Sequence, residues 1–310
     1  MRLKADITLF IISIIWGSAF VAQRVAGQLG SVYLFNGARY ILAGLVVLPF
    51  VGRNSISSNA REQYKWMFIA GFLLFLAAAL QQAGMLYTTA GNAGFITSLY
   101  VVLVPFVVLI GWKEKPHWLS VVAVGLAGAG AYLLSTGGQF EVQRGDALEL
   151  VGALFWALHV VVLGKLVSKF EPMSFSVGQL LVCGVLNLIV GLYIEQPIFT
   201  WPLAGAAVYT AVMSLGLCYT LQVWAQRHTP PSDAALLLSL ESVFAVLAGW
   251  LLLDERLVGL QYIGCIMIFV AVALSQVKEW TQRSTPRSLS KEEECGERGT
   301  MDIDHLVEGR

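Results

Sequence analysis

Charge is scarce in this chain. Only 13% of its 310 residues are Asp, Glu, Lys or Arg, which is about half the proportion found in soluble globular domains. The 20 basic and 20 acidic residues balance, so the basic surplus that marks nucleic-acid-binding domains is missing. The composition excludes an ordinary soluble domain and gives no reason to expect nucleic acid as a partner.

Cysteines and catalytic motifs are also few. The spacing of the four cysteines indicates neither a disulfide framework nor a metal site. The phosphate-binding pattern G-x-x-x-x-G-K-[ST], the zinc pattern H-E-x-x-H and the nucleophile pattern G-x-S-x-G do not occur. We therefore expect no metal, no cofactor and no enzymatic activity, and we exclude ATP hydrolysis by this chain.

Long apolar runs dominate what is present. Hydrophobic residues make up 57% of the chain, and the mean hydropathy is +0.70. An α-helix needs about 20 apolar residues to cross a bilayer. Runs of this length predict an all-α polytopic membrane protein with ten transmembrane helices. The predicted helices cover residues 7–25, 32–51, 66–87, 93–112, 118–135, 147–167, 173–194, 203–226, 234–253 and 257–277.

The positions of Lys and Arg predict the orientation. These residues accumulate in the cytoplasmic loops of membrane proteins. With a cytoplasmic N-terminus, ten of them fall in segments on the cytoplasmic side and three on the other side. No A-x-A-like cleavage site follows the first apolar run, so we expect a retained helix. We expect both termini in the cytoplasm, and a disordered, charged tail at 278–310.

The two halves of the chain repeat each other. One set of identical residues recurs at a constant spacing: Trp16 and Trp156, Val21 and Val161, Phe35 and Phe175, Gly44 and Gly184, and Leu48 and Leu188. A second set recurs at a spacing one position longer: Thr88 and Thr229, Ala93 and Ala234, Ser98 and Ser239, Leu99 and Leu240, Val102 and Val243, and Glu114 and Glu255.

The repeat predicts an inverted architecture. Each half holds five predicted helices, an odd number, so the second half enters the membrane from the opposite side. We expect two inverted five-helix repeats, residues 1–136 and 146–277, with a substrate site between them near the middle of the bilayer. The alternative is a gene duplication that only built a stable bundle.

These features resemble a known family of carriers. The two five-helix repeats, the stretch WGSAF at 16–20, Arg39 in the second helix, and Glu114 and Glu255 at the ends of the fourth and ninth helices resemble the drug/metabolite transporter superfamily, EamA type. The resemblance covers residues 1 to about 277. The aromatic-rich spans are similar to those of YddG-type exporters of aromatic amino acids. The resemblance implies export of small metabolites or drugs across the bacterial inner membrane.

Three ionisable residues lie well inside predicted spans: Arg39, His159 and Glu241. Such residues are rare in membranes and often mark substrate or ion pathways. Glu241 could bind a substrate ammonium group or carry a coupling proton, or it could serve only as a structural partner of Arg39. His159 could bind substrate or be a hydrogen-bonded core histidine. We interpret Arg39 as a structural charge, with carboxylate binding as the alternative.

Aromatic and amide side chains complete the predicted site. Trp16 and Trp156 occupy matched positions, and indole rings facing a wet cavity would suit planar aromatic or cationic ligands. Plain core packing is the alternative. Amides suit a site for zwitterions because they form hydrogen bonds without adding charge. The other candidate substrate-binding residues are Gln82, Tyr100, Gln179, Tyr219 and Gln222.

Polar residues at the predicted helix ends have a structural interpretation. Asn92 and Asp233 occupy matched positions at two turns, and we expect them to cap the helices that follow. Glu114 stands beside Lys113 and Lys115, and we expect ion pairs there that lock helix ends.

The sequence thus predicts a secondary carrier that exports small amphipathic metabolites by alternating access, with aromatic or other apolar amino acids as the expected substrates. Its partners would be the small-molecule substrate, the lipid bilayer and, if transport is coupled, protons, but no nucleic acid. One alternative is export of drugs or lipophilic cations held by Trp16, Trp156 and Glu241. Another is a membrane receptor or partner subunit without transport activity.

Overall fold

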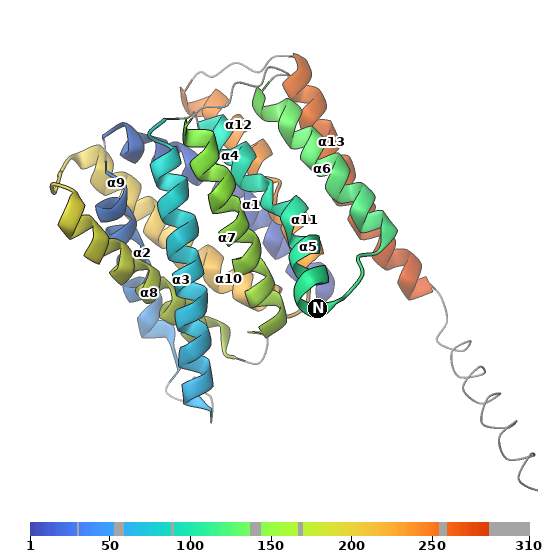
Figure 1. Cartoon of the computed structure of the whole chain (residues 1–310), viewed down its shortest axis with the longest axis horizontal. Coiled ribbons are helices and arrows are strands. Elements are labelled where there is room, and N and C mark those ends of the chain that lie inside the picture. Colours follow the sequence, from blue (N-terminus) through green and yellow to red (C-terminus); the bar gives the residue numbers. More distant parts are fainter. Residues whose placement is uncertain are drawn as a thin grey trace, which may run out of the picture.

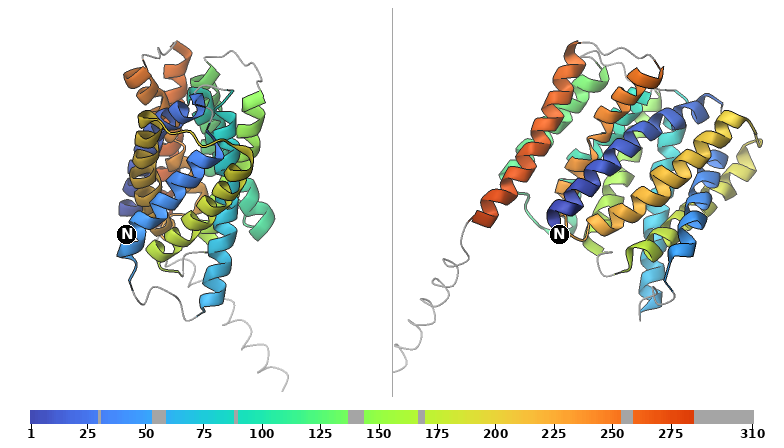
Figure 2. Two further views of the ribbon diagram at one scale, coloured as in Figure 1. Left: turned by 90° about the vertical axis from the view of Figure 1, so that its left-hand side faces the viewer. Right: turned by 180° about the vertical axis from the view of Figure 1, so that it is seen from behind.

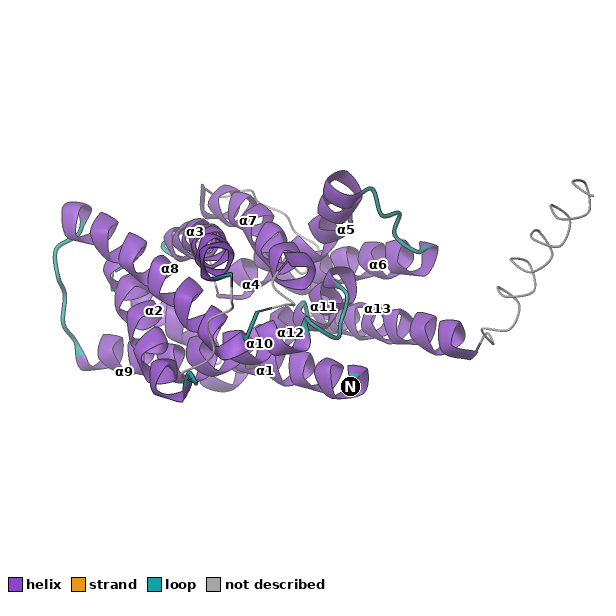
Figure 3. Ribbon diagram, turned by 90° about the horizontal axis from the view of Figure 1, so that it is seen from below, coloured by secondary structure: helices purple, strands orange, loops and turns teal. Residues whose placement is uncertain are grey.

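The computed structural model describes residues 1–29, 31–52, 59–87, 90–136, 144–166, 170–253 and 259–284. The regular elements within these residues are all helices, and no strand occurs among them (Figure 3). The helices are α1 (Arg2–Gln28), α2 (Tyr33–Val47), η1 (Leu48–Phe50), α3 (Ala60–Gly84), α4 (Ala90–Ser98), α5 (Tyr100–Trp112), α6 (Trp118–Thr136), α7 (Arg144–Leu166), α8 (Pro172–Ile194), α9 (Trp201–Tyr209), the π-helical stretch η2 (Thr210–Leu217), α10 (Cys218–Ala225), α11 (Pro231–Leu238), α12 (Glu241–Leu253) and α13 (Gly259–Ser284).

Many of these helices are suited to a membrane. Among the described residues, 7 helical segments are long and apolar enough to cross a bilayer, and three shorter apolar helices accompany them: Ile96–Trp112, Trp118–Gly130 and Gly259–Ala271. The predicted all-helical, multi-pass membrane protein is therefore confirmed. Its outer surface carries large apolar side chains that would face lipid, such as Ile110 at 80% and Trp201 at 81% exposure.

Two predicted helices are interrupted. The predicted fourth helix is divided at Leu99 into α4 and α5, and the predicted ninth helix is divided at Ser239–Leu240 into α11 and α12. Leu99 and Leu240 are matched positions of the repeat, so the two breaks are equivalent. Both segments remain apolar helical segments across the turn, over Ile96–Trp112 and Pro231–Leu252, but hydropathy did not predict the turn inside each of them. Each break places a polar residue, Tyr100 or Glu241, at the start of the following helix.

Helix packing follows the internal repeat. When the matched residues of the two halves are aligned, α7 corresponds to α1, α12 to α5, and α11 to α4. The contacts are reciprocal: α1 packs on α12 as α7 packs on α5, and α4 packs on α12 as α11 packs on α5. The helix α2 packs on its own counterpart α8, and α6 packs on α13 along one side of the bundle (Figures 1 and 2). Reciprocal contacts of this kind relate two halves by a two-fold rotation.

The helices α1 and α7 run in opposite directions. Near the end of α1, Arg24 donates a 2.7 Å hydrogen bond from Nη1 to the Met85 carbonyl, just after α3. Near the start of α7, Glu149 packs against Gly84, the last residue of α3. The end of α1 and the start of α7 therefore lie on the same side of the bundle (Figure 1). We call the side on which α1 begins the N-terminal side, and the other the opposite side.

Glycines allow α2 and α8 to approach closely. A Cβ added at Gly44 would lie 2.7 Å from the Leu181 side chain, and one added at Gly184 would lie 2.7 Å from the Ile41 side chain. Leu181 is the repeat counterpart of Ile41, as Gly184 is of Gly44, so the two contacts are equivalent. These two equivalent contacts place α2 and α8 next to the pseudo-two-fold axis.

Backbone groups at the start of α2 are bound by a side chain from the end of α8. The N-cap residue of α2, Val32, has no side-chain acceptor. The Glu195 carboxylate instead accepts hydrogen bonds from the backbone N–H groups of Val32, Tyr33 and Leu34 at 2.9–3.1 Å. A carboxylate at a helix N-terminus satisfies free N–H groups and complements the helix dipole. This contact ties α2 to α8 on the opposite side.

The end of the last helix and the contacts of Glu114 differ from the prediction, and other predicted groups lie outside the described residues. The helix α13 continues to Ser284, past the predicted start of the tail at 278, while residues 285–310 are outside the described part. Glu114 pairs with Lys165 of α7 instead of its neighbours in sequence. Glu255, the acid matched to Glu114, and the side chain of Asn92 are not among the described groups.

Candidate functional site

A cavity lies between the two halves of the bundle. It contains about 510 Å³ of space not filled by atoms, the open solvent at its mouth included. Helices α1 to α5 contribute one part of its wall, and α7, η2, α10 and α12 contribute the other. The lining residues are Trp16, Phe20, Gln23, Arg39, Tyr40, Gln81, Thr97, Tyr100, Trp156, Val160, Ser214, Leu215, Tyr219, Gln222 and Glu241.

The acid of the cavity is Glu241. It is the first residue of α12, directly after the helix break, and only 4% of its surface is exposed. Its carboxyl group lies beside the hydroxyl of Tyr100, the matched residue at the start of α5. The Tyr100 hydroxyl interacts with this carboxyl group and has no hydrogen bond to any other described residue. Both side chains line the cavity, so a ligand that reaches Glu241 would also lie beside the Tyr100 hydroxyl.

The cation of the cavity is Arg39, which is 2% exposed. Its Nε donates to the Asn36 side-chain oxygen at 2.9 Å, and Asn36 is itself held by a 3.0 Å hydrogen bond to the Ala78 carbonyl. The guanidinium carbon lies 5.1 Å from the Phe35 ring centre and 5.2 Å from that of Tyr40. These contacts hold the guanidinium by one edge, and its terminal nitrogens have no hydrogen bond to another described residue.

Aromatic side chains form another part of the cavity wall. The rings of Trp16 and Tyr219 lie 5.2 Å apart, and those of Tyr40 and Tyr219 lie 6.5 Å apart. The Trp16 indole N–H donates to the Ser214 carbonyl at 2.8 Å. Ser214 belongs to η2, and π-helical stretches are rare and often found at functional sites. The wall is therefore oriented by a hydrogen bond as well as by packing.

His159 supports this wall from behind. It is fully buried but does not line the cavity. Its Nε2 lies 2.9 Å from the Gln179 side-chain oxygen, and its ring contacts the edges of Trp156 at 6.3 Å and Tyr219 at 5.8 Å between centres. His159 and Gln179, both predicted to bind substrate, thus form a pair one layer outside the lining.

The predicted glutamine of α3 is displaced by one position. Gln82 is not among the lining residues and donates to the Gln23 carbonyl at 3.0 Å, whereas its neighbour Gln81 lines the cavity. The remaining predicted residues, Trp16, Tyr100, Trp156, Tyr219, Gln222 and Glu241, come together in the lining with Arg39.

Several lining residues were not among the predicted site residues. Phe20 and Gln23 lie one and two turns after Trp16 on α1, so helical spacing alone indicates their face. Thr97 and Ser214 had no such signal, because single hydroxyls in apolar spans usually bond to their own helix. Glu149, a buried acid at 1% exposure, was missed because it lies near the end of its span.

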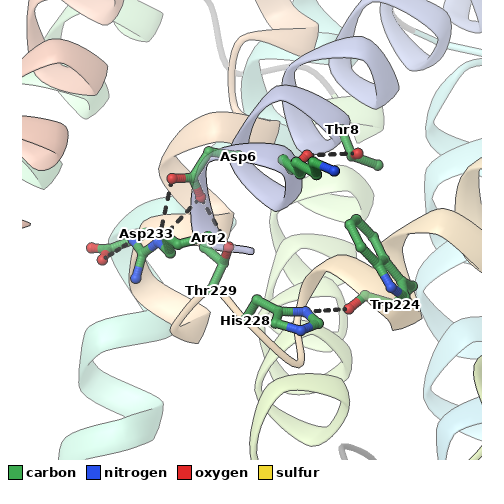
Figure 4. A network of polar contacts seen from close by, with 8 residues as sticks. Arg2, Asp6, Thr8, Trp224, His228, Thr229 and Asp233 are labelled. Atoms are coloured by element: carbon green, nitrogen blue, oxygen red, sulfur yellow. Dashed lines mark hydrogen bonds and ion pairs between the residues drawn. The ribbon is translucent and has the colours of Figure 1, made fainter.

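A polar network joins helix ends on the N-terminal side (Figure 4). Arg2 pairs with Asp6 of the same helix at 3.2 Å and with Asp233 of α11 at 2.8 Å. Thr229 donates to Asp6 at 2.9 Å. We call these four residues the Arg2 cluster. Asp233 was predicted to cap the next helix, but α11 begins at Pro231 after Pro230, without a side-chain cap, and Asp233 binds Arg2.

A family profile matches the chain twice. The profile described as the EamA-like transporter family covers residues 3–136 and 143–276, which together hold the whole cavity. The chain belongs to the EamA-like transporter family. The resemblance found in the sequence is thereby confirmed at the level of the family.

Related EamA-type proteins are named as transporters. An "uncharacterized transporter" of Archaeoglobus fulgidus is 33% identical over 89% of this chain and 87% of its own length. The inner membrane transporter YedA of Escherichia coli is 25% identical over 86% of this chain and 88% of its own length. An S-adenosylmethionine/S-adenosylhomocysteine transporter of Chlamydia muridarum is 23% identical over 84% of this chain and 90% of its own length. The names indicate a multi-pass membrane transporter and not an enzyme.

The fold of this EamA-type chain also occurs among solved structures. One crystal structure of a protein matches 93% of this chain and 100% of its own chain, with a TM-score of 0.77 and 15% sequence identity. At this identity the match shows the fold alone.

Proposed function

We propose that the protein is a secondary carrier that exports small amphipathic metabolites from the cytoplasm, with aromatic and other apolar amino acids as its substrates. One observation carries the proposal. A single cavity, lined by both repeats, combines a buried carboxyl group, a buried guanidinium group and a wall of aromatic rings.

Each part of an aromatic amino acid finds a complementary group in this cavity. Glu241 offers a carboxylate to the ammonium group, and ionised groups form the stronger hydrogen bonds. The terminal nitrogens of Arg39 offer a planar pair of donors to the carboxylate. Trp16 and Tyr219 provide the apolar surface for the side chain. This assignment gives Arg39 a binding role where the sequence favoured a structural one.

The membrane arrangement follows from the repeat. We propose ten crossings in two inverted five-helix repeats, residues 1–136 and 146–277, with both termini in the cytoplasm and the charged tail extending from the last helix. The substrate site would lie between the repeats, and their rocking would expose it to each side in turn. For a bacterial cell the location would be the inner membrane.

S-adenosylmethionine and S-adenosylhomocysteine form a second candidate substrate class. The relative from Chlamydia muridarum is named for their transport. Both compounds carry an amino-acid head group and a planar adenine ring, so they present the same three groups as an aromatic amino acid. The same residues would hold them, with the adenine on the aromatic wall.

Binding and transport assays separate these substrates. Purified protein would be screened by thermal shift against tryptophan, phenylalanine, S-adenosylmethionine and a quaternary ammonium drug, and the ligands found would be tested by counterflow in proteoliposomes. We expect tryptophan or phenylalanine to stabilise the protein and to exchange across the vesicle membrane. Stabilisation by the quaternary ammonium compound alone would indicate a multidrug carrier, and binding without counterflow would indicate a receptor.

A further inference from the structure

A chain of hydrogen bonds leads from the cavity wall to a buried acid outside it. The Gln81 side-chain nitrogen donates to the Thr97 hydroxyl oxygen at 3.0 Å, and the Thr97 hydroxyl donates to the Glu149 carboxylate at 3.1 Å. Gln81 and Thr97 line the cavity. Glu149 lies one step beyond, on α7, with 1% of its surface exposed.

Close packing of α3 on α7 makes this chain possible. A Cβ added at Gly84 would lie 2.7 Å from the Glu149 side chain, so only glycine leaves room for the acid beside α3. On the other helix, a Cβ added at Gly152 would lie 3.4 Å from the Leu80 side chain, an ordinary van der Waals contact. Gly84 therefore leaves the space in which Glu149 reaches Thr97.

The donor and acceptor order of this hydrogen-bond chain determines the orientation of the Gln81 amide. A carboxylate accepts hydrogen bonds and donates none. The Thr97 proton therefore points to Glu149, and the Thr97 oxygen offers only lone pairs to Gln81. The amide must present its nitrogen to Thr97, which leaves its oxygen free to face the cavity. No described residue donates a hydrogen bond to that oxygen.

The second repeat shows that the fold does not need these polar groups. Gln222 is the repeat counterpart of Gln81 and also lines the cavity. The positions matched to Thr97 and Glu149 hold Leu238 and Leu9, both fully buried in one apolar cluster. Consequently no such chain orients the Gln222 amide, and its oxygen has no partner among the described residues.

We propose that Thr97 and Glu149 are positioning residues that hold Gln81 as a fixed hydrogen-bond acceptor for the ammonium group of the substrate. The inference rests on the proposed function, because it assumes a ligand with an amino group. It adds an acceptor from the first repeat to Glu241 of the second repeat, so that both repeats would hold the amino end of the substrate.

Three probes and three variants test this role. The probes are tryptophan, tryptamine, which keeps the amine only, and indole-3-propionate, which keeps the carboxylate only; binding to purified full-length protein is measured by calorimetry. In Thr97→Val the shape is kept and the hydroxyl is lost. We expect tryptophan and tryptamine to bind about five-fold more weakly, because hydrogen bonds to charged groups contribute substantially, while indole-3-propionate changes by less than about two-fold.

Thr97→Ser restores the hydroxyl and should restore the preference for the amine over the carboxylate probe. The double variant T97L/E149L copies the leucines of the second repeat, so it should fold and should lose the same preference as Thr97→Val. Equal weakening of the amine and carboxylate probes in Thr97→Val, or an unchanged preference in the double variant, would overturn the positioning role and leave the proposed function standing. Failure of all three probes to bind the wild-type protein would overturn both.

Discussion

The two repeats contribute chemically different residues at matched positions of this cavity. This asymmetry determines which ligands the cavity can bind. Tyr100 and Glu241 occupy the same place after the two helix breaks, yet one is a neutral phenol and the other an acid. Arg39 is matched to Gln179, which lies outside the lining beside His159. A symmetric pocket would bind a symmetric ligand, so one acid and one guanidinium favour a ligand with two different ends.

Replacing Glu241 by Gln tests the acid. The amide keeps the size of the side chain but can neither ionise nor carry a proton, so we expect loss of proton-linked transport and at least ten-fold weaker binding of substrates with an ammonium group. The measurement is counterflow and pH-gradient-driven uptake in proteoliposomes. Glu241→Asp, which keeps the carboxyl group, serves as the control. If uptake by Glu241→Gln kept its pH dependence, the coupling proton would have to be carried elsewhere.

At the scale of residues, the sequence predicts which helix faces carry polar side chains. It is a weaker guide to which side chains contact each other or line the cavity. Trp16 and Glu241 were identified because aromatic and charged groups inside apolar spans are conspicuous. Gln82 was preferred to Gln81, since successive residues on a helix differ by about 100° in direction and the sequence does not show where the neighbouring helix lies. His159 was predicted to bind substrate because a buried histidine in a lining and one behind it look alike in sequence.

At the scale of elements, the departures from regular helix coincide with the cavity. The breaks at Leu99 and Leu240 and the π-helical stretch η2 all contribute lining residues or their immediate neighbours. Hydropathy predicted the spans but not these irregularities, because it reflects the polarity of side chains and not the geometry of the backbone. At η2, the Trp16 indole donates to the Ser214 carbonyl, a contact between helices that the sequence does not show.

The contact of α2 with α8 gives a prediction about stability. In Gly184→Leu the new side chain would start 2.7 Å from the Ile41 side chain and 2.8 Å from its backbone nitrogen. Overpacking of this kind typically costs about 1–3 kcal/mol, so we expect a lower thermal unfolding midpoint and weaker transport. Gly125→Leu is the matched control, because no atom lies within 4 Å of a Cβ added there. Equal midpoints for the two variants would contradict the close packing of α2 on α8.

At the scale of the whole molecule, the Arg2 cluster links the two repeats on the N-terminal side. It joins the start of α1, in the first repeat, to the start of α11, in the second. Beneath it, the apolar cluster that includes Leu9 and Leu236 fills the space toward the cavity. If the repeats rock against each other, these contacts must separate for the cavity to open on this side.

Arg2→Ala should make that opening easier. The Asp233 carboxylate would lose its 2.8 Å ion pair with Arg2, the contact that joins α1 to α11. We expect a cysteine introduced at Ser214, in the cavity wall, to react several-fold faster with a thiol reagent supplied from the N-terminal side. Lys4→Ala, which removes an exposed charge from the same helix, is the control and should leave the rate unchanged. Equal rates in both variants would show that the Arg2 cluster is not part of the closure.

The proposed inverted arrangement predicts which connections between helices lie on the same side of the membrane. Because α1 and α7 run in opposite directions, the two repeats are threaded in opposite senses. The α5–α6 connection then lies on the N-terminal side, and the α8–α9 connection lies on the other side. In a variant without the four native cysteines, Lys115→Cys should react with an impermeant maleimide only in inside-out vesicles, and Gln196→Cys only in intact cells. Both positions are exposed, so access to the reagent depends on the membrane alone. Labelling of both cysteines from one side would be incompatible with two five-helix repeats of opposite orientation, because an odd number of predicted crossings separates the two positions.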